Sequence, residues 1–436
     1  MVEIELKFQI SEARRTALLK ALDPKKSETI QLQAKYFDTP DRLLAQHGAA
    51  LRQRLEGTRW IQTLKAAGKS HLHRFEHNHN LGELESSPEL DLSIYEAIPE
   101  AQQILTQALG VDAAALKLTF ETDIQRTYRV IEFEDAEIEV CLDVGVVRAS
   151  GREQTIHEVE FELKSGSVQS LLAFSFEWVK KYQLWLDVRS KAEMGNLLAL
   201  EQTVSPARFE KEFVLSKKES AAHNLSLLIG QQMQHLLPNI AAISAGVAEQ
   251  SHIDQAQTAL EHLQLTLALF KDWNSNISDK WAMQLAAFKH QFDHLQHLQH
   301  MQSTLGAFLQ NPTTTENLAK DILYAQEKLG NLVKSTQNVH HYLELLTFSL
   351  ISHDQVQKQD LKTYAHNTLQ KQYRQLQESL NAADISHFES LDVLAQKIKE
   401  LKFSFPILTS IYDVKNLQKY SKALNDAQQA AHEYQI

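Results

Sequence analysis

The stretch that decides the fold of the N-terminal half is Val2–Ile10, VEIELKFQI, in which apolar and polar residues alternate without a break. Because successive side chains of a β-strand point to opposite faces, Glu3, Glu5 and Lys7 share one face and the apolar residues share the other. Alternation of this kind is the ordinary signature of an antiparallel sheet with one solvated face. A single such strand indicates a β fold and does not by itself indicate a function.

The same alternation recurs in seven further short segments. The expected strands are Val2–Ile10, Ala34–Phe37, Ala50–Leu55, Trp60–Lys65, His73–Asn78, Thr122–Ile131, Ala136–Val144 and Thr155–Leu163. Eight strands are enough to close a small barrel. Helices are expected at Ser11–Leu22, Pro99–Leu109 and Ser167–Tyr182, and the first and last of these start with a serine suited to N-capping.

The chain changes character after Ser216, where apolar residues recur at helical spacing, as in Leu260, Leu263 and Leu267. The preceding segment TVSPARFEKEFVL contains Pro206 and flanking charges, as a connection between domains often does. We therefore predict an α+β protein. An N-terminal eight-stranded antiparallel β-barrel with flanking helices occupies residues 1–203, a linker lies at about 204–215, and a C-terminal all-α helical bundle occupies residues 216–436.

Length and composition limit the possible functions. A chain of 436 residues exceeds what one hydrophobic core usually serves. The formal net charge of −11 argues against a nucleic-acid partner. One cysteine, Cys141, permits no intramolecular disulfide and fits a reducing compartment. The sequence shows no signal peptide and no apolar run of the roughly 18 to 20 residues that span a bilayer. We expect a cytoplasmic protein without a membrane partner, and the sequence does not indicate its oligomeric state.

Charged residues recur on one face of strand after strand. If these faces converge inside a barrel, the lumen holds both signs of charge, and desolvating them without partners costs several kcal/mol per ion. A polyphosphate with bound cations supplies both counter-charges, because arginine and lysine bind phosphate oxygens while carboxylates hold hard cations such as Mg²⁺ or Mn²⁺. The same-face groups are Arg52 with Arg54, Thr63 with Lys65, Arg74 with Glu76, Glu137 with Glu139 and Asp143, and Glu158 with Glu160 and Glu162.

The opening EIELKF resembles the Glu-x-Glu-x-Lys signature of the CYTH superfamily. These are the triphosphate tunnel metalloenzymes, which include inorganic triphosphatases, thiamine triphosphatases and class IV adenylate cyclases. Further segments continue the resemblance in order along the chain as far as Ala192. They are YFDTPD at Tyr36–Asp41, LRQR at Leu51–Arg54, Lys65, Arg74 with Glu76, Arg126, EIEVCLD at Glu137–Asp143, EVEFE at Glu158–Glu162, and Ser190–Lys191–Ala192.

The resemblance implies roles for individual residues. It implies that phosphate is bound, and catalysis carried, by Lys7, Arg52, Arg54, Lys65, Arg126 and Lys191, with Arg74 as a further phosphate ligand. The implied metal-facing set is Glu3, Glu5, Asp143, Glu158, Glu160 and Glu162, with Glu76, Glu137 and Glu139 as further candidates. The family often has an arginine after Ser-Lys-Ala, where this chain has Glu193 and Met194, so one basic contact is absent or supplied by Arg189.

The second half resembles a CHAD domain, a helical, histidine-containing module often fused behind CYTH domains, especially in bacterial inorganic triphosphatases. This pairing favours inorganic triphosphate, a small polyanion, as the substrate, hydrolysed with Mg²⁺ or Mn²⁺ by in-line attack of water. Two alternatives stay open. One is a thiamine or nucleoside triphosphatase, or a class IV adenylate cyclase-like enzyme, with Trp60 or Tyr36 stacked on an organic ring. The other is a non-catalytic polyphosphate-binding module.

The helical half is expected to lack a polyanion surface. The segment IDQAQTALEHLQLTLALF carries glutamines where a polyphosphate-binding CHAD helix is expected to carry basic residues, and Arg374 is the single arginine after Ser216. His290, His294 and His297 share one helical face, but we interpret them, with His340–His341, as a solvated face and assign no metal to them. A packing or assembly role is the prediction for this half.

Overall fold

The structure is a computed structural model that describes residues 2–68, 73–110, 115–305, 312–351, 360–412 and 418–435. It divides into two compact units. The first comprises Met1–Arg208, Leu237–Gln255 and Asn311–Leu343, and the second comprises Phe209–Leu236, Ala256–Gln310 and Glu344–Ile436. The first unit therefore includes segments of the helical half, and the domain limits derived from the sequence stay a prediction.

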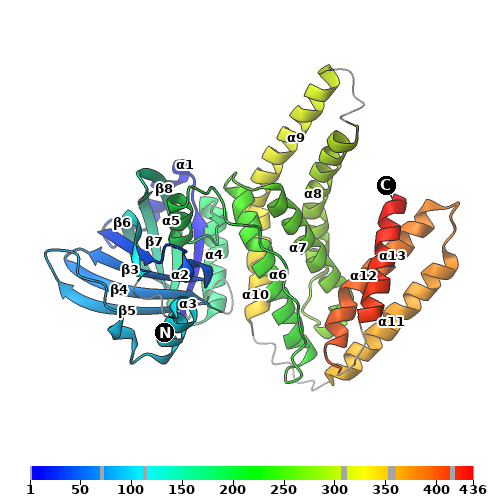
Figure 1. The fold of residues 1–436 in the computed structure, drawn as a ribbon, viewed down its shortest axis with the longest axis horizontal. Coiled ribbons are helices and arrows are strands. Elements are labelled where there is room, and N and C mark those ends of the chain that lie inside the picture. The colour runs from blue at the N-terminus through cyan, green and yellow to red at the C-terminus, as the bar shows by residue number, and fades with distance from the viewer. Residues whose placement is uncertain are drawn as a thin grey trace. The chain divides into compact units, whose positions relative to one another are not determined.

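Eight of the described strands form a closed antiparallel barrel (Figure 1). They are hydrogen-bonded in the order β5-β4-β3-β2-β6-β7-β8-β1, and pairing between β1 and β5 closes the ring. Their bounds are β1 (Val2–Gln9), β2 (Glu28–Asp38), β3 (Ala49–Glu56), β4 (Arg59–Ala67), β5 (His73–Glu83), β6 (Lys117–Phe133), β7 (Ala136–Ala149) and β8 (Arg152–Ser165). The predicted barrel is confirmed, and a short strand β9 (Trp185–Leu186) pairs with β1 in addition.

Helices connect and cover the strands. They are α1 (Glu12–Ala21), α2 (Leu43–Gln46), α3 (Pro99–Leu109), α4 (Val168–Tyr182) and α5 (Lys191–Ala199). The three predicted helices correspond to α1, α3 and α4, and the Ser167 side chain caps α4 by accepting a hydrogen bond from the backbone N–H of Ser170. The short helices α2 and α5 were not predicted.

The barrel wall has an apolar core on each of its two faces. On the outer face, Phe161 of β8 packs edge-on against Phe174 and Trp178 of α4. On the inner face, which carries the charged residues, an apolar cluster joins β2, β6, β7 and β8 to Met194 of α5. The charged residues therefore share the lumen with an apolar plug against which α5 packs. The inner cluster consists of Leu32, Ala34, Tyr36, Phe120, Ile124, Val147, Ala149, Ile156 and Met194.

The described residues of the C-terminal part are helical, as predicted. The helices are α6 (Ala221–Ser244), α7 (Gln250–Leu269), α8 (Asp279–Leu305), α9 (Pro312–Val333), α10 (Thr336–Leu350), α11 (Leu361–Ala382), α12 (Phe388–Thr409) and α13 (Gln418–Gln435). Leu260, Leu263 and Leu267 of α7 are buried, which confirms the apolar stripe read from their spacing. Within the part of the chain that the structure describes, no helix combines the length and the apolar character of a membrane span.

One glycine shows how tightly α5 packs. A methyl group added at Gly195 would lie 2.1 Å from Cδ2 of Phe120, well inside van der Waals contact. Gly195→Ala is therefore expected to force α5 off the inner cluster and to lower the free energy of unfolding by about 1–3 kcal/mol. Chemical denaturation measures this change.

Gly230→Ala in α6 is the matched control. There the added methyl would lie 3.4 Å from Cβ of Ser349, an ordinary contact, so the substitution should be neutral or stabilising by up to about 1 kcal/mol. Equal denaturation midpoints for Gly195→Ala and the unchanged protein would contradict the close packing of α5.

Candidate active site

Strand register brings the charged residues of neighbouring strands into rows. Arg126 of β6 lies opposite Asp143 of β7, and Asp143 lies opposite Glu158 of β8. On the other side of β8, Glu160 lies opposite Lys7 of β1. Because side chains alternate along each strand, all of these groups face the lumen. The convergence expected from the sequence is therefore present for these residues.

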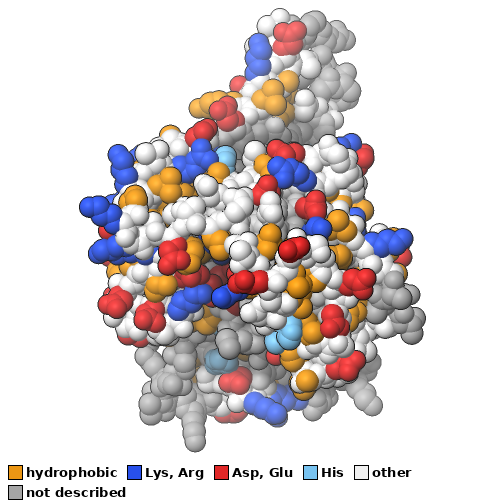
Figure 2. Space-filling model, turned by 90° about the vertical axis from the view of Figure 1, so that its left-hand side faces the viewer, with side chains coloured by type: hydrophobic (Ala, Val, Ile, Leu, Met, Phe, Trp, Pro, Cys, Tyr) orange, Lys and Arg blue, Asp and Glu red, His pale blue; other side chains and the backbone are white. Residues whose placement is uncertain are grey.

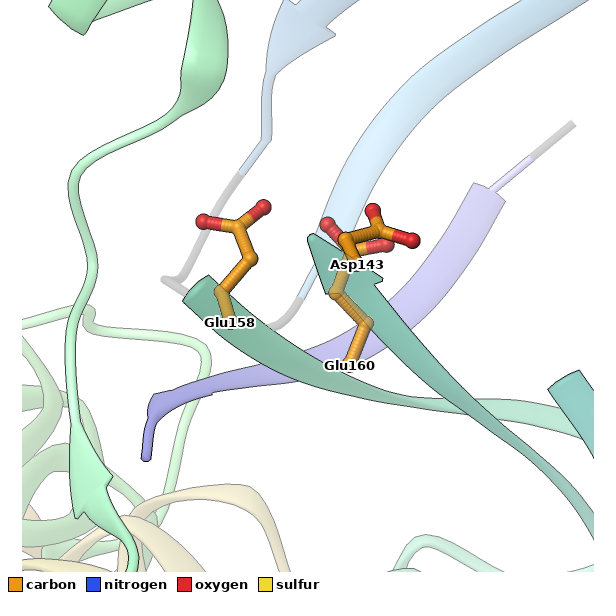
Figure 3. A group of neighbouring side chains, drawn as sticks. All are labelled: Asp143, Glu158 and Glu160. Carbon is orange, nitrogen blue, oxygen red and sulfur yellow. The ribbon is translucent and has the colours of Figure 1, made fainter. Parts of the chain in front are cut away.

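Three carboxylates form a group that could hold a metal ion, and we call Asp143, Glu158 and Glu160 the carboxylate cluster (Figure 3). Each offers one oxygen, and the three oxygens lie within 4.8 Å of one another. The side chains of Asp143 and Glu158 are fully buried, and that of Glu160 is 15 % exposed. Oxygen ligands at this density suit hard divalent cations.

Cations compensate the carboxylate cluster. Arg126 binds Asp143 through two parallel hydrogen bonds of 2.7 and 2.6 Å and also donates to Glu160. Lys191 Nζ lies 2.8 Å from Asp143 Oδ2 and 2.8 Å from Glu160 Oε1, and it also contacts Glu158 Oε1. Burial raises the pKa of Glu158, whereas Lys191 and Arg126, acting against burial, hold the pKa of Glu160 well below its ordinary range.

A second group of charged side chains lies where β1, β4 and β5 are neighbours. Lys65 Nζ lies 2.8 Å from Glu3 Oε2 and 3.0 Å from Glu76 Oε2. Arg74 Nη1 lies 2.8 Å from Glu5 Oε1. Burial raises the pKa of Glu3 to about 8, and the neighbouring carboxylates Glu5 and Glu76 add to the rise. Closely spaced carboxylates here repel one another, so a cation or a shared proton is favoured between them.

The two arginines of β3 border the inner apolar cluster. Arg52 Nη1 donates to the hydroxyl of Tyr36 at 3.4 Å, and its Nη2 lies 3.9 Å from Glu76 Oε1. Arg54 donates through Nε to Glu56 at 2.6 Å. Burial and the nearby Arg52 guanidinium lower the pKa of Arg54. Arg52 and Arg54 lie two residues apart on one face of β3, and two neighbouring positive charges favour a bound anion.

Buried polar atoms in the lumen lack hydrogen bonds. Within the described part of the chain, Lys7 Nζ, Arg52 Nε and Glu158 Oε2 have no hydrogen-bond partner, although Lys7 Nζ lies 3.6 Å from Glu158 Oε2. An unsatisfied buried charged group costs more than about 1–3 kcal/mol. Figure 2 shows the face that lies on the left in Figure 1, where acidic and basic side chains gather around a recess. A ligand carrying both charges would satisfy these groups.

Three further predicted metal-facing residues belong neither to the carboxylate cluster nor to the group around Lys65 and Arg74. Glu162 and Glu139 share Lys164, whose Nζ lies 2.9 and 3.2 Å from them. Glu137 is exposed and accepts a hydrogen bond of 2.9 Å from Ser165 Oγ. Sequence reasoning missed Lys164 and, on β3, Glu56. Lys164 lies two residues after Glu162, and Glu56 lies two residues after Arg54. The alternation of charged residues on these strands could therefore have identified both.

Other predicted positions have structural roles. Asp38 of the YFDTPD segment is buried, and its carboxylate accepts hydrogen bonds from the backbone N–H groups of Thr39, Leu44 and Ala45, which fixes the start of α2. The guanidinium of Arg189 pairs with Asp187 through bonds of 3.1 and 2.8 Å.

The histidines that were assigned to a solvated face do not share one environment. His290, His294 and His297 are exposed on α8. His341 of α10 is buried with 1 % exposure, so including it in a solvated face was wrong. Leu345 and Phe348, four and seven residues further along α10, lie on the same helical face as His341 and are also buried, which places this histidine in a core.

Residues 1–196 match the family model of the CYTH domain. This part of the chain is a CYTH domain. The inorganic triphosphatase of Haemophilus influenzae is 33% identical over 227 residues, which are 50% of this chain and 62% of that protein. The chain thus matches less than two thirds of the length of this relative.

Two solved structures resemble parts of the chain. An adenylyl cyclase-like protein from Hippeastrum, described as having a dominant triphosphatase activity, is 17% identical, with a TM-score of 0.33; the match covers 46% of this chain and 97% of that chain. The CHAD domain of the plant Ricinus communis is 11% identical, with a TM-score of 0.46; the match covers 52% of this chain and 79% of that chain.

The pairing of Arg126 with Asp143 should contribute most of the stability of the barrel wall where β6 and β7 pair. Arg126→Met leaves the fully buried carboxylate of Asp143 short of its bidentate partner, and we expect the free energy of unfolding to fall by about 3 kcal/mol. The double variant Arg126→Met/Asp143→Asn removes the uncompensated charge and should recover part of the loss.

Arg148→Met is the matched control, because Arg148 also contacts two carboxylates but its side chain is 49 % exposed. Exposed pairs contribute less than about 1 kcal/mol. Chemical denaturation of the three variants measures the differences. A loss at Arg148 as large as the loss at Arg126 would contradict the account.

Proposed function

We propose that the CYTH domain hydrolyses inorganic triphosphate to diphosphate and phosphate, with Mg²⁺ or Mn²⁺ as cofactor. The observation that carries the proposal is the enclosure of opposite charges in one lumen, with Lys7 Nζ, Arg52 Nε and Glu158 Oε2 buried and lacking hydrogen-bond partners within the described residues. A triphosphate with its cation satisfies both the donors and the acceptor. The relative named inorganic triphosphatase supports the same substrate.

The residues present fit a hard divalent cation. Asp143, Glu158 and Glu160 offer oxygens within 4.8 Å of one another, and Glu3 and Glu5 are further carboxylates in the lumen. A bound cation would supply Lewis-acid polarisation of phosphate oxygens. The chain's own cations Lys7, Arg52, Arg54, Lys65, Arg74, Arg126 and Lys191 would bind the phosphate oxygens, hold the chain of phosphates in line and stabilise the charge that develops on the leaving diphosphate.

The chemistry needs no covalent nucleophile. Water attacks the terminal phosphorus, the bond from that phosphorus to the bridging oxygen breaks, and the electron pair leaves with diphosphate. A lumen carboxylate accepts the proton that the water loses. Carboxylates outnumber what metal binding alone requires, so one of them remains available for this step.

The aromatic residues favour an inorganic over an organic substrate. Tyr36 is stacked on Phe120 with ring centroids 4.3 Å apart and is only 5 % exposed, so that ring face is already occupied. Trp60 alternates with the lumen-facing Ile61 and Thr63 and therefore lies on the outer face of β4. Neither arrangement suits stacking on a thiazole or a nucleobase, which weighs against the thiamine, nucleoside and cyclase alternatives.

We further propose that the helical half, the CHAD-like part, serves packing or assembly. The segment IDQAQTALEHLQLTLALF contains no lysine or arginine, and Arg374 is the one arginine of the sequence after Ser216. A cytoplasmic location and the absence of a nucleic-acid partner remain predictions from composition.

A substrate panel tests the proposed reaction. Phosphate release from triphosphate, ATP and thiamine triphosphate is measured in Mg²⁺ and in Mn²⁺. We expect triphosphate to be preferred, and Glu5→Gln and Lys65→Ala each to reduce kcat/KM by about 100-fold or more, as loss of a charge-stabilising group usually does. Chelation of the metal should abolish turnover.

Arg59→Ala is the control for Lys65→Ala, because Arg59 lies on the same strand with its side chain 65 % exposed and pairs only loosely with Glu83 at 3.6 Å. It should keep the activity of the unchanged protein. Full activity in both lumen variants would show that the site is misplaced. Preference for ATP or thiamine triphosphate would favour the organic alternatives, and tight calorimetric binding of triphosphate in Mg²⁺ without hydrolysis would favour a binding module.

A further inference from the structure

Lys191 occupies an unusual position for a cation. It is the first residue of α5, whose N-cap is Ser190. Backbone N–H groups give the start of a helix a partial positive charge, which disfavours a lysine there. The side chain is nevertheless 13 % exposed and points into the lumen. The contacts of its ammonium group must therefore outweigh the local repulsion.

Those contacts are the oxygens that a metal would need. Lys191 Nζ lies 2.8 Å from Asp143 Oδ2 and 2.8 Å from Glu160 Oε1, and it contacts Glu158 Oε1. It thus touches every member of the carboxylate cluster, whose oxygens lie within 4.8 Å of one another. An ammonium group and a divalent cation cannot occupy the same centre, because both require these oxygens at contact distance.

The charges of the cluster balance without a metal. The carboxylate cluster carries three negative charges, and the described cations in contact with it, Arg126, Lys191 and Lys7, carry three positive charges. A divalent cation entering the cluster adds two positive charges. The site then becomes suited to an anion, and Lys191 loses its carboxylate partners.

We propose that Lys191 is an exchangeable counter-ion, which fills the centre of the carboxylate cluster in the metal-free protein and is displaced by the divalent cation to bind a phosphate group of the substrate. The identity of that substrate rests on the proposed function. The metal releases Lys191 from the carboxylates, and the triphosphate binds the released lysine. Binding of the metal and binding of triphosphate are therefore mutually favourable.

The packing of α5 indicates how the exchange occurs. Gly195 lies against the Phe120 ring, so the helix is held in place and has little freedom to withdraw. The four-carbon stem of lysine is flexible and its three donors rotate freely. The exchange therefore requires rotation of the Lys191 side chain and leaves the helix where it is.

Calorimetric titration with Mn²⁺ alone, without triphosphate, tests the exchange. Lys191→Met removes the competing cation, so we expect Mn²⁺ to bind at least about fivefold more tightly than to the unchanged protein. Lys191→Arg keeps a competing charge and should not bind Mn²⁺ more tightly. In EDTA, Lys191→Met should change the affinity for sodium triphosphate less than twofold, because the lysine is engaged with carboxylates when metal is absent.

Lys164→Met is the matched control. It also removes one lysine charge, but Lys164 lies on β8 and contacts Glu139 and Glu162 instead of the carboxylate cluster. It should leave Mn²⁺ affinity unchanged. Unchanged or weaker Mn²⁺ binding by Lys191→Met overturns the exchange while leaving the proposed metal site intact. Absence of Mn²⁺ binding in every variant overturns the metal site as well. If Lys191→Met does not fold, Lys191→Gln replaces it with the same expectation.

Discussion

The structure depends on one constraint, which is that ions buried inside a barrel must each meet a counter-charge. Asp143 and Glu158 are fully buried, and both are in contact with Lys191. Most lumen carboxylates also contact a lysine or arginine from a different strand. Beside the outer helix α4 and the inner apolar cluster, apolar side chains exclude water from the wall, which strengthens the pairings there. The same pairings hold the wall together and prepare it for a charged ligand.

The proposed function rests on the charged lumen groups that are incompletely paired. Lys7 Nζ and Arg52 Nε are buried without hydrogen-bond partners among the described residues, and Glu3 has a pKa raised to about 8 because burial and neighbouring carboxylates disfavour its charge. A lumen optimised only for stability would replace such groups with apolar side chains, which are often as stable or more stable. A polyphosphate with a hard cation, as proposed, would satisfy the donors and the acceptors together.

The sequence predicted which face of a strand each charged residue occupies, but it did not predict which residues of different strands come into contact. Period-two alternation placed Glu3, Glu5 and Lys7 on one side of β1, and it needs only local geometry. Which carboxylates converge depends on strand register, which bulges and turns determine. Glu160 and Glu162 are indistinguishable by alternation, yet the first joins Asp143 and the second pairs with Lys164. The helix that carries Lys191 is nine residues long, too short for its apolar period to stand out, so its packing against Phe120 was not foreseeable.

The central claim is that one lumen binds phosphates and a divalent cation together. The most direct measurement is crystallographic, with Mn²⁺ and triphosphate added to crystals of the full chain immediately before freezing and data collected for anomalous scattering from manganese. The account predicts a manganese peak in contact with Asp143, Glu158 and Glu160, and phosphate density between that peak and the side chains of Lys7 and Arg52. A manganese peak or phosphate density confined to the outer surface of the barrel would contradict it.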